Sequence, residues 1–290
     1  MIPKHLFRSA LVLLSVMVLA LTGACSGLHT DETETMPAKP AAAGKAEPNW
    51  PHERSDLEPD PEVIFGQLDS GVRYVLMPND RPRDRVSMHL NIQAGSMHET
   101  DPQQGLAHFL EHLMFNGTEH FPPGEIIKYF QSIGMKFGPD ANAHTSFYET
   151  VYDILLPAGD PKSLDEGLLV MEDFATSAHL LPEEIDKERR VILEEMRARD
   201  SASWRTFVKT LQFEMPNARI SERLPIGKRE TIANADRELL KDFYDTWYRP
   251  DRLVLVMVGN FDPETAIPLI EKRFGAMEAR APERPEPPFG

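Results

Sequence analysis

The chain has 290 residues, of which 41% are hydrophobic and 27% are charged, a composition typical of a globular protein with a sizeable core. Acidic residues outnumber basic residues by 46 to 31, which gives a formal net charge of -15. Phosphate binding depends on patches of lysine and arginine, and no such block occurs, which argues against nucleic acid as a partner. Extended or cationic peptides are compatible with this charge.

The first 25 residues have the pattern of an export signal. Lys4 and Arg8 come before an apolar run from Ala10 to Leu21, and only Ser15 interrupts this run. The run is too short for a membrane span and small residues follow it, so we expect it to be cleaved. Residues 1–25 are therefore predicted to be a signal peptide.

The only cysteine of the chain lies where this signal would be cut. The segment Leu21-Thr22-Gly23-Ala24-Cys25 resembles a bacterial lipoprotein signal, in which Cys25 is lipidated, although Thr22 stands where that pattern usually has Leu. This interpretation predicts a periplasmic protein that is anchored to the bacterial outer membrane by a lipid. The lipid would be its only attachment to a membrane. The alternative is an ordinary secretory signal cut after Ala24, which predicts a secreted protein. Neither interpretation allows an internal disulfide.

Three further stretches predict the domain organisation. Residues 26–59 are rich in Pro, Ala, Glu, Thr and Lys and lack apolar periodicity, which is typical of a flexible tether. Residues 60–276 carry periodic apolar patterns and are predicted to fold. Residues 277–290 include a Pro-rich stretch from Ala281 onward, which predicts a linker to a further, C-terminal part of the protein.

Apolar periodicity predicts the elements of the folded part. Val86, Met88, Leu90 and Ile92 alternate with polar residues, as in a half-buried strand. In chain order, the expected elements are strands at 63–65, 72–77 and 86–92, a helix at 104–116, a helix after Pro122-Pro123, a strand at 148–156, helices at 161–178, 182–202 and 236–247, a strand at 253–258 and a helix from Pro263. This order predicts an α+β fold with one mostly antiparallel sheet faced by helices.

Two histidines and a glutamate have the spacing H-x-x-E-H. On a helix, residues i and i+4 lie on the same face, so His108 and His112 can bind one ion, and Glu111 projects beside them. Zinc lowers the pKa of a bound water to about 7, and a nearby carboxylate can take its proton as it attacks a peptide carbonyl. One helical turn therefore predicts two zinc ligands and a general base.

The alternative is a helix whose histidines lie at the surface or pack in the core without a metal. The predicted helix is apolar nearly all round, which indicates that it is buried. Burial of two histidines and a glutamate without partners is costly, and a metal removes that cost. The apolar residues concerned are Leu106, Phe109, Leu110, Leu113 and Met114.

A catalytic zinc site usually has three protein ligands, so the motif requires a third. In the predicted helix after Pro182, Glu188 and Glu195 fall near the middle of an apolar stripe, whereas Glu194 points about 100° away. Acidic residues central to a buried face suggest a function. For Glu188, the alternative is a buried ion pair, for example with an arginine.

These motifs, with others in the same order, resemble the pitrilysin/insulinase family of zinc peptidases, the peptidases with an inverted H-x-x-E-H motif. The resemblance covers about residues 60 to 275. The matching segments are His108-Phe-Leu-Glu-His112, Phe115-Asn-Gly-Thr118, Ile133-Gly-Met-Lys-Phe-Gly138, Asn142-Ala-His-Thr-Ser146, Glu149-Thr-Val-Tyr152, Glu188-Arg-Arg-Val-Ile-Leu-Glu-Glu195, Leu224-Pro-Ile-Gly227 and Trp247-Tyr-Arg-Pro250.

The resemblance implies roles for individual residues. It implies that residues 60–276 are a catalytic domain holding one zinc ion per chain, with Glu195 as the third ligand and Glu188 as a second acid that supports catalysis. It also implies that one strand pairs with an extended peptide substrate. The residues of that strand are Asn142, Ala143, His144 and Thr145, of which His144 stands where the family commonly has an aromatic residue.

The resemblance also implies that the whole enzyme has two halves, which face each other like the halves of a clamshell. The second half of such enzymes contributes an arginine and a tyrosine to substrate binding, and nothing in these 290 residues matches that half.

We therefore expect a zinc-dependent endopeptidase or oligopeptidase for unfolded peptides, with Glu111 as general base. Its partner would be the C-terminal half of the same protein or a homologous subunit. The alternatives are a non-catalytic zinc-binding or scaffold subunit, and a metal store, which would not require Glu111.

Overall fold

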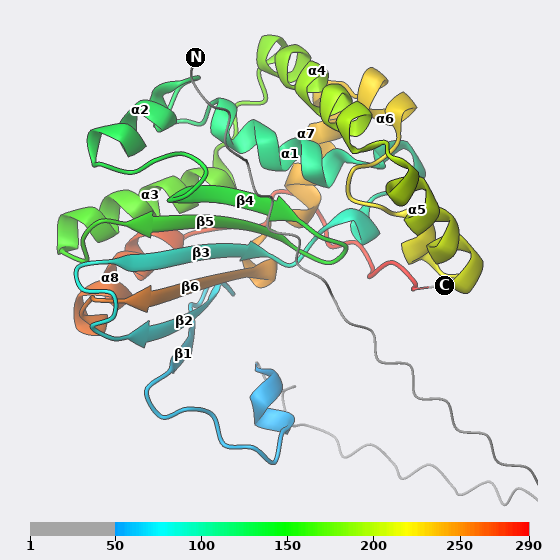
Figure 1. Ribbon diagram of the computed structural model, residues 1–290. Coiled ribbons are helices and arrows are strands. Elements are labelled where there is room, and N and C mark those ends of the chain that lie inside the picture. The colour runs from blue at the N-terminus through cyan, green and yellow to red at the C-terminus, as the bar shows by residue number, and fades with distance from the viewer. Residues whose placement is uncertain (1–49, 290) are drawn as a thin grey trace, which may run out of the picture. The chain divides into compact units, whose positions relative to one another are not determined.

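The computed structural model of the chain describes residues 50–289 (Figure 1). The predicted signal peptide, Cys25 and most of the predicted tether lie outside the described residues. The chain divides into two compact units, residues up to Ser55 and residues from Asp56. In the first unit the described residues contain one short 3-10 helix, η1 (Pro51–Arg54).

The second unit is built on a six-stranded sheet whose strands follow the order β1-β2-β6-β3-β5-β4. Strands β2 and β6 pair in parallel and the other neighbours pair antiparallel, which confirms the predicted α+β fold with a mostly antiparallel sheet. The strands are β1 (Ile64–Gln67), β2 (Arg73–Pro78), β3 (Val86–Ile92), β4 (Ala141–Thr145), β5 (Thr150–Leu156) and β6 (Leu253–Gly259).

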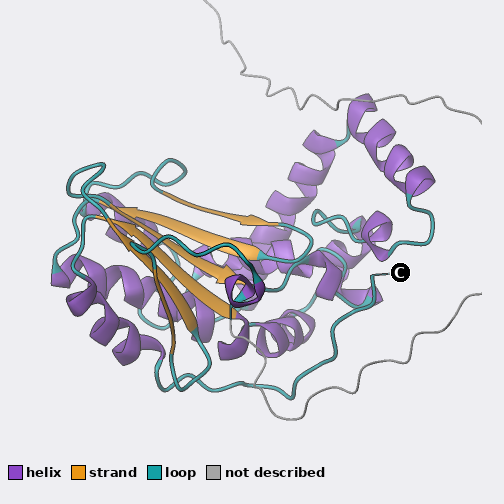
Figure 2. Ribbon diagram, turned by 90° about the horizontal axis from the view of Figure 1, so that it is seen from below, coloured by secondary structure: helices purple, strands orange, loops and turns teal. Residues whose placement is uncertain are grey.

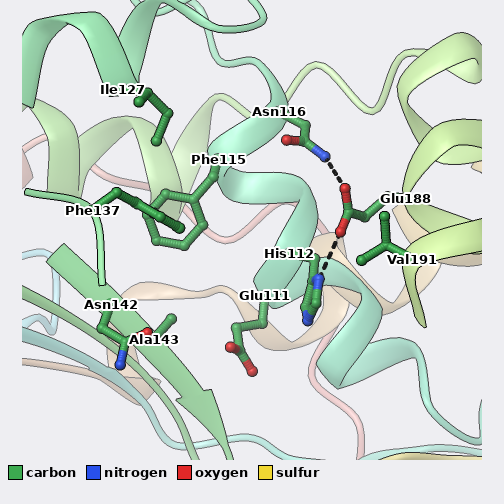
Figure 3. Close-up of a pocket in the computed structure, with 10 residues that line it drawn as sticks. All are labelled: Glu111, His112, Phe115, Asn116, Ile127, Phe137, Asn142, Ala143, Glu188 and Val191. Atoms are coloured by element: carbon green, nitrogen blue, oxygen red, sulfur yellow. Dashed lines mark hydrogen bonds and ion pairs between the residues drawn. The ribbon is translucent and has the colours of Figure 1, made fainter. Parts of the chain in front are cut away.

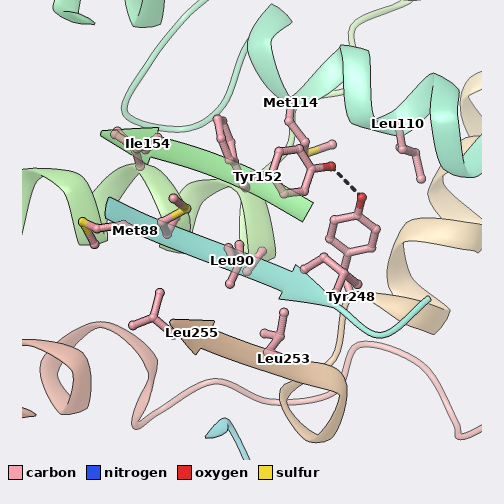
Figure 4. Close-up of a cluster of buried hydrophobic side chains, with 14 of the residues drawn as sticks. Met88, Leu90, Leu110, Met114, Tyr152, Ile154, Tyr248, Leu253 and Leu255 are labelled. Atoms are coloured by element: carbon pink, nitrogen blue, oxygen red, sulfur yellow. Dashed lines mark hydrogen bonds between the residues drawn. The ribbon is translucent and has the colours of Figure 1, made fainter. Parts of the chain in front are cut away.

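One face of this sheet forms the core. The predicted alternation in β3 is confirmed, because Met88 and Leu90 are fully buried while the residues between them are only half-buried. Tyr152 of β5 points into the same core, where its hydroxyl is 2.7 Å from the hydroxyl of Tyr248 (Figure 4). Since both rings are buried, each hydroxyl provides the partner that the other requires.

Helices cover this face and one end of the sheet. Helices α3 and α8 pack side by side against the sheet (Figures 1 and 2). Among the described residues, no helix has the length and apolar character needed to span a membrane. The α-helices are α1 (Leu106–Leu113), α2 (Glu125–Ser132), α3 (Pro161–Thr176), α4 (Pro182–Arg199), α5 (Ala202–Glu214), α6 (Arg229–Asn234), α7 (Arg237–Trp247) and α8 (Pro263–Phe274).

Several boundaries differ from the expected ones. The helix expected at 104–116 is α1 followed by a 3-10 turn, η4 (Met114–Asn116), and the helix expected at 182–202 ends at Arg199. A new helix, α5, then begins at Ala202. Its N-cap is Ser201, whose side chain accepts a hydrogen bond from the backbone nitrogen of Trp204. Helix α5 was not predicted, although Trp204, Phe207, Val208 and Leu211 have the i, i+3, i+4, i+7 spacing of a helix; none of its residues is buried.

Helix α1 has a fixed place at the edge of the sheet, since it contacts β4 and β5 on one side and α4 and α7 on the other. Gly105, which precedes it, has a φ of +100°, and a Cβ atom there would lie 2.9 Å from the Cα of Gly227. Only glycine therefore fits at this entry to the helix. The carboxylate of Glu99 is fully buried and accepts hydrogen bonds from the backbone nitrogens of Gly105 and Ala107, each at 2.9 Å.

We predict that Glu99→Ala lowers the free energy of unfolding by about 3 kcal/mol, because it leaves two buried N–H groups at the start of α1 without an acceptor. Urea denaturation of the two proteins measures this difference. The exposed Glu183 in the first turn of α4 is the control, and Glu183→Ala should change stability by less than about 0.5 kcal/mol. Equal effects of the two substitutions would show that Glu99 does not fix α1.

Candidate functional site

The side chains of the H-x-x-E-H motif lie on one face of helix α1, which is turned toward α4 and β4. His108 and Glu111 are buried and His112 is half-buried, so the predicted burial of this helix is confirmed. The Nε2 atoms of the two histidines lie 3.2 Å apart. Burial lowers the pKa of His108 to about 3, with a smaller contribution from His112, so the His108 imidazole is neutral at neutral pH. A neutral imidazole is the form that binds metals.

Helix α4 brings a third group to the two histidines. One carboxylate oxygen of Glu195 lies 3.5 Å from Nε2 of His108 and 3.7 Å from Nε2 of His112. In a tetrahedral zinc site with bonds of about 2.0–2.2 Å, neighbouring ligand atoms lie roughly 3.4 Å apart. The three observed distances fit that spacing, and the donor set of two imidazoles and one carboxylate is one that zinc accepts. These side chains can therefore hold one metal ion.

Glu188 joins the two helices beside this group (Figure 3). One carboxylate oxygen is 2.7 Å from Nδ1 of His112, and the other accepts a hydrogen bond of 2.7 Å from the side-chain amide of Asn116. Burial raises the pKa of Glu188, but these two hydrogen bonds outweigh it and the pKa lies below its usual value. With Nδ1 of His112 turned to Glu188, Nε2 is left to face a metal. The partner of Glu188 is thus a histidine rather than an arginine.

Glu111 lies between the metal-binding group and the edge of the sheet. Its carboxylate accepts a hydrogen bond of 2.6 Å from the hydroxyl of Thr145 on β4. Burial raises the pKa of Glu111 above its ordinary value, although the bond from Thr145 and the charge of His112 oppose this shift. A carboxylate with a raised pKa is suited to accept a proton.

The apolar stripe predicted along α4 is only partly buried. Ile185 and Ile192 lie in the core, but Val191 is 50% exposed, and the side chains of Glu188 and Glu195 are 15% and 30% exposed. The difference arises because this face of α4 borders an open pocket rather than a closed core. Glu194 points away to solvent, as predicted.

Strand β4 forms the free edge of the sheet opposite these helices, and it carries the four residues expected to pair with a substrate. A pocket of about 490 Å³ lies between β4 and the helices and is lined by apolar side chains of Phe115, Ile127, Phe137 and Val191 (Figure 3). We call it the apolar pocket. Asn142 and Ala143 border it on the β4 side, and Glu111 and His112 on the α1 side.

Comparison with known families agrees with this geometry. The model of the insulinase family, peptidase family M16, matches residues 74–217, and the model of the M16 inactive domain matches residues 234–290. The chain belongs to the insulinase family of metallopeptidases. The resemblance identified from the motifs is thereby confirmed.

The relatives include proteins described as zinc proteases. The chain is 39% identical over 223 residues to the probable zinc protease PqqL of Escherichia coli, and 34% identical over 221 residues to the zinc protease PQQL-like of Arabidopsis thaliana. These alignments cover 77% and 76% of this chain and 24% and 23% of the relatives. The chain thus spans about a quarter of the length of the curated relatives it matches.

Solved structures show the same fold. The crystal structure of the first half of the periplasmic protease PqqL from Escherichia coli matches with a TM-score of 0.76 and 37% identity. The match covers 81% of this chain and 50% of that chain. This chain and that half of PqqL therefore share the mixed sheet with flanking helices.

Three contacts at the site were not anticipated from the sequence. They are the amide of Asn116 on Glu188, the hydroxyl of Thr145 on Glu111, and the pairing of Arg199 with the second carboxylate oxygen of Glu195. The spacing of Glu195 and Arg199, i and i+4 on a helix, is a signal that could have revealed the last contact. The first two join distant segments and carry no such signal.

We predict that the purified chain binds about one zinc ion, and that Glu195→Ala abolishes this binding, because the substitution removes one of three converging ligand atoms. Metal analysis after dialysis measures the occupancy. Glu194→Ala, on the exposed side of the same helix, is the control and should retain the ion. Glu188→Gln should also retain most of it, because Glu188 contacts the ligand His112 rather than the ion. Loss of zinc from Glu194→Ala alone would contradict this arrangement.

Proposed function

We propose that the chain is the catalytic domain of a zinc-dependent endopeptidase or oligopeptidase. In this proposal His108, His112 and Glu195 bind zinc and Glu111 is the general base. The observation that carries it is the convergence of three ligand atoms within 4.8 Å of one another, beside a buried carboxylate and at the free edge of a sheet. Membership of a metallopeptidase family supports the same function.

The chemistry follows from the positions of these side chains. Zinc, when bound, lowers the pKa of a water ligand to about 7 and polarises the substrate carbonyl. One oxygen of Glu111 is engaged by Thr145, which leaves the other free to accept the proton of the attacking water and to pass it to the leaving nitrogen. Glu188 holds the ring of His112 in one orientation, so it supports catalysis without touching the substrate.

The substrates we propose are unfolded peptides. A peptide can add to the edge of a sheet only when its backbone is extended, because main-chain hydrogen bonds to the edge strand hold it. β4 offers such an edge through Asn142, Ala143, His144 and Thr145. The apolar pocket next to Ala143 can take a large side chain beside the cleaved bond.

We further propose that full activity requires a second half, either the C-terminal half of the same protein or a homologous subunit. β4 can hold one side of an extended peptide, and the opposite wall has to come from elsewhere. This chain aligns with only about a quarter of the length of its relatives, so the relatives contain further parts that could supply this wall. The alternative is a non-catalytic scaffold subunit, and a peptidase assay distinguishes the two.

Glu111→Gln is predicted to lower kcat by about 10²- to 10⁴-fold while leaving the zinc content unchanged, because a neutral amide cannot accept the proton. Hydrolysis of a quenched peptide, with the second half added, measures kcat. Glu119→Gln, an exposed position beyond the same helix, is the control and should keep full activity. A wild-type chain without peptidase activity even with its second half would indicate the scaffold function.

We propose a periplasmic location with Cys25 as a lipid anchor. The lipoprotein-like signal supports the anchor, and a relative described as a periplasmic protease supports the compartment.

A Cys25→Ser variant, expressed from its own signal, is expected to move from the membrane fraction to the soluble periplasm, because it lacks the residue to be lipidated. Cell fractionation followed by immunoblotting measures this. Unchanged partitioning into membranes would leave the ordinary secretory signal as the better interpretation.

A further inference from the structure

A second pocket contains the candidate zinc site, because His108, His112 and Glu195 all line it. Its volume is about 270 Å³, and it shares a wall of Glu111, His112 and Ala143 with the apolar pocket. Along β4, Asn142 borders only the apolar pocket, whereas His144 borders only the second one. A peptide paired with β4 would therefore place side chains from opposite sides of the cleaved bond into different pockets.

The two pockets differ in charge. No lysine or arginine lines the apolar pocket, whereas Arg199 lines the second together with His144, so we call the second the arginine pocket. Both side chains remain open to solvent, with 43% of Arg199 and 55% of His144 exposed.

Arg199 retains donors for a ligand. Its guanidinium pairs with Glu195 through one nitrogen and lies 5.8 Å from the ring of Trp204. A guanidinium has five N–H donors, so this single pair leaves others available. The guanidinium plane also matches the geometry of a second carboxylate.

His144 faces the pocket from the opposite wall. Its Nδ1 atom is 3.9 Å from Asp153, a carboxylate that is itself paired with His89 on the next strand. Among residues 50–289, the Nε2 atom of His144 has no hydrogen-bond partner, and it can donate to a carboxylate when it carries the ring proton. The two carboxylates that also border the pocket, Glu111 and Glu195, belong to the candidate zinc site, where a bound zinc ion would balance their charge.

We propose that Arg199 and His144 recognise a carboxylate, so that the preferred substrates have Asp or Glu next to the cleaved bond, on the side opposite the residue in the apolar pocket. This inference rests on the proposed peptidase function and names its substrate class. A charge-assisted hydrogen bond strengthens binding about tenfold, which sets the expected preference.

The test measures binding, so that it does not depend on turnover. Zinc-loaded Glu111→Gln protein, with the second half added, is titrated with dye-labelled, capped peptides that carry a central Phe-Glu or Glu-Phe pair, and with counterparts in which Gln replaces Glu. Fluorescence anisotropy gives each Kd. In one of the two orders, the Glu peptide should bind about tenfold more tightly than its Gln counterpart.

Two variants assign the preference to the pocket. Adding His144→Leu and Arg199→Met together should reduce the Glu-to-Gln ratio to about one, with zinc content measured in parallel. Arg197→Met is the matched control, because Arg197 lies on the same helix but pairs with the exposed Glu194, and it should leave the ratio unchanged.

Each outcome decides the inference. Equal binding of Glu and Gln peptides in both orders would overturn it while leaving the peptidase function intact. A preference that survives the double variant would assign recognition to other residues and would overturn it too. If no peptide binds, the proposed function fails and this inference fails with it.

Discussion

The site depends on one constraint, which is that three candidate ligand atoms from two helices converge on one point. The ligands on the two helices, His112 and Glu195, are more than eighty residues apart in the sequence. His108 and His112 share one turn of α1, so their relation is local. Glu195 comes from α4, and its position depends on how α4 packs against α1. The hydrogen bond between Glu188 and His112 joins the helices at this point. It fixes the spacing of the helices and the orientation of one ligand ring together.

The same helix α1 is held at its other side by the sheet. Glu99 and Gly105 fix the start of the helix, and the hydroxyl of Thr145 reaches Glu111 from the edge strand. A peptide that adds to β4 would therefore lie beside Glu111, the proposed general base, without any change in the position of the helix. The proposed zinc ligands, the proposed base and the edge strand β4 are thus joined by direct contacts, as pre-organised catalysis requires.

Features set by local sequence could be predicted, and features set by contacts between distant segments could not. The alternation in β3 and the spacing of His108, Glu111 and His112 follow from the periods of strands and helices. Glu195 was placed near the site by its position in a stripe and assigned as a ligand by family resemblance. The exposure of Val191 was missed, because a periodic pattern cannot distinguish a core from a pocket wall. Helix α5 was also missed, although the helical spacing of Trp204, Phe207, Val208 and Leu211 is visible in the sequence.

The position of zinc relative to these helices tests the account most directly. Anomalous diffraction at the zinc edge, recorded from crystals of the zinc-loaded chain, locates the ion and its ligands. The account predicts one ion bound to Nε2 of His108, Nε2 of His112 and a carboxylate oxygen of Glu195, with Glu188 on Nδ1 of His112 and outside bonding distance of the metal. An ion coordinated by Glu188 in place of Glu195, or one located away from α1, would contradict it.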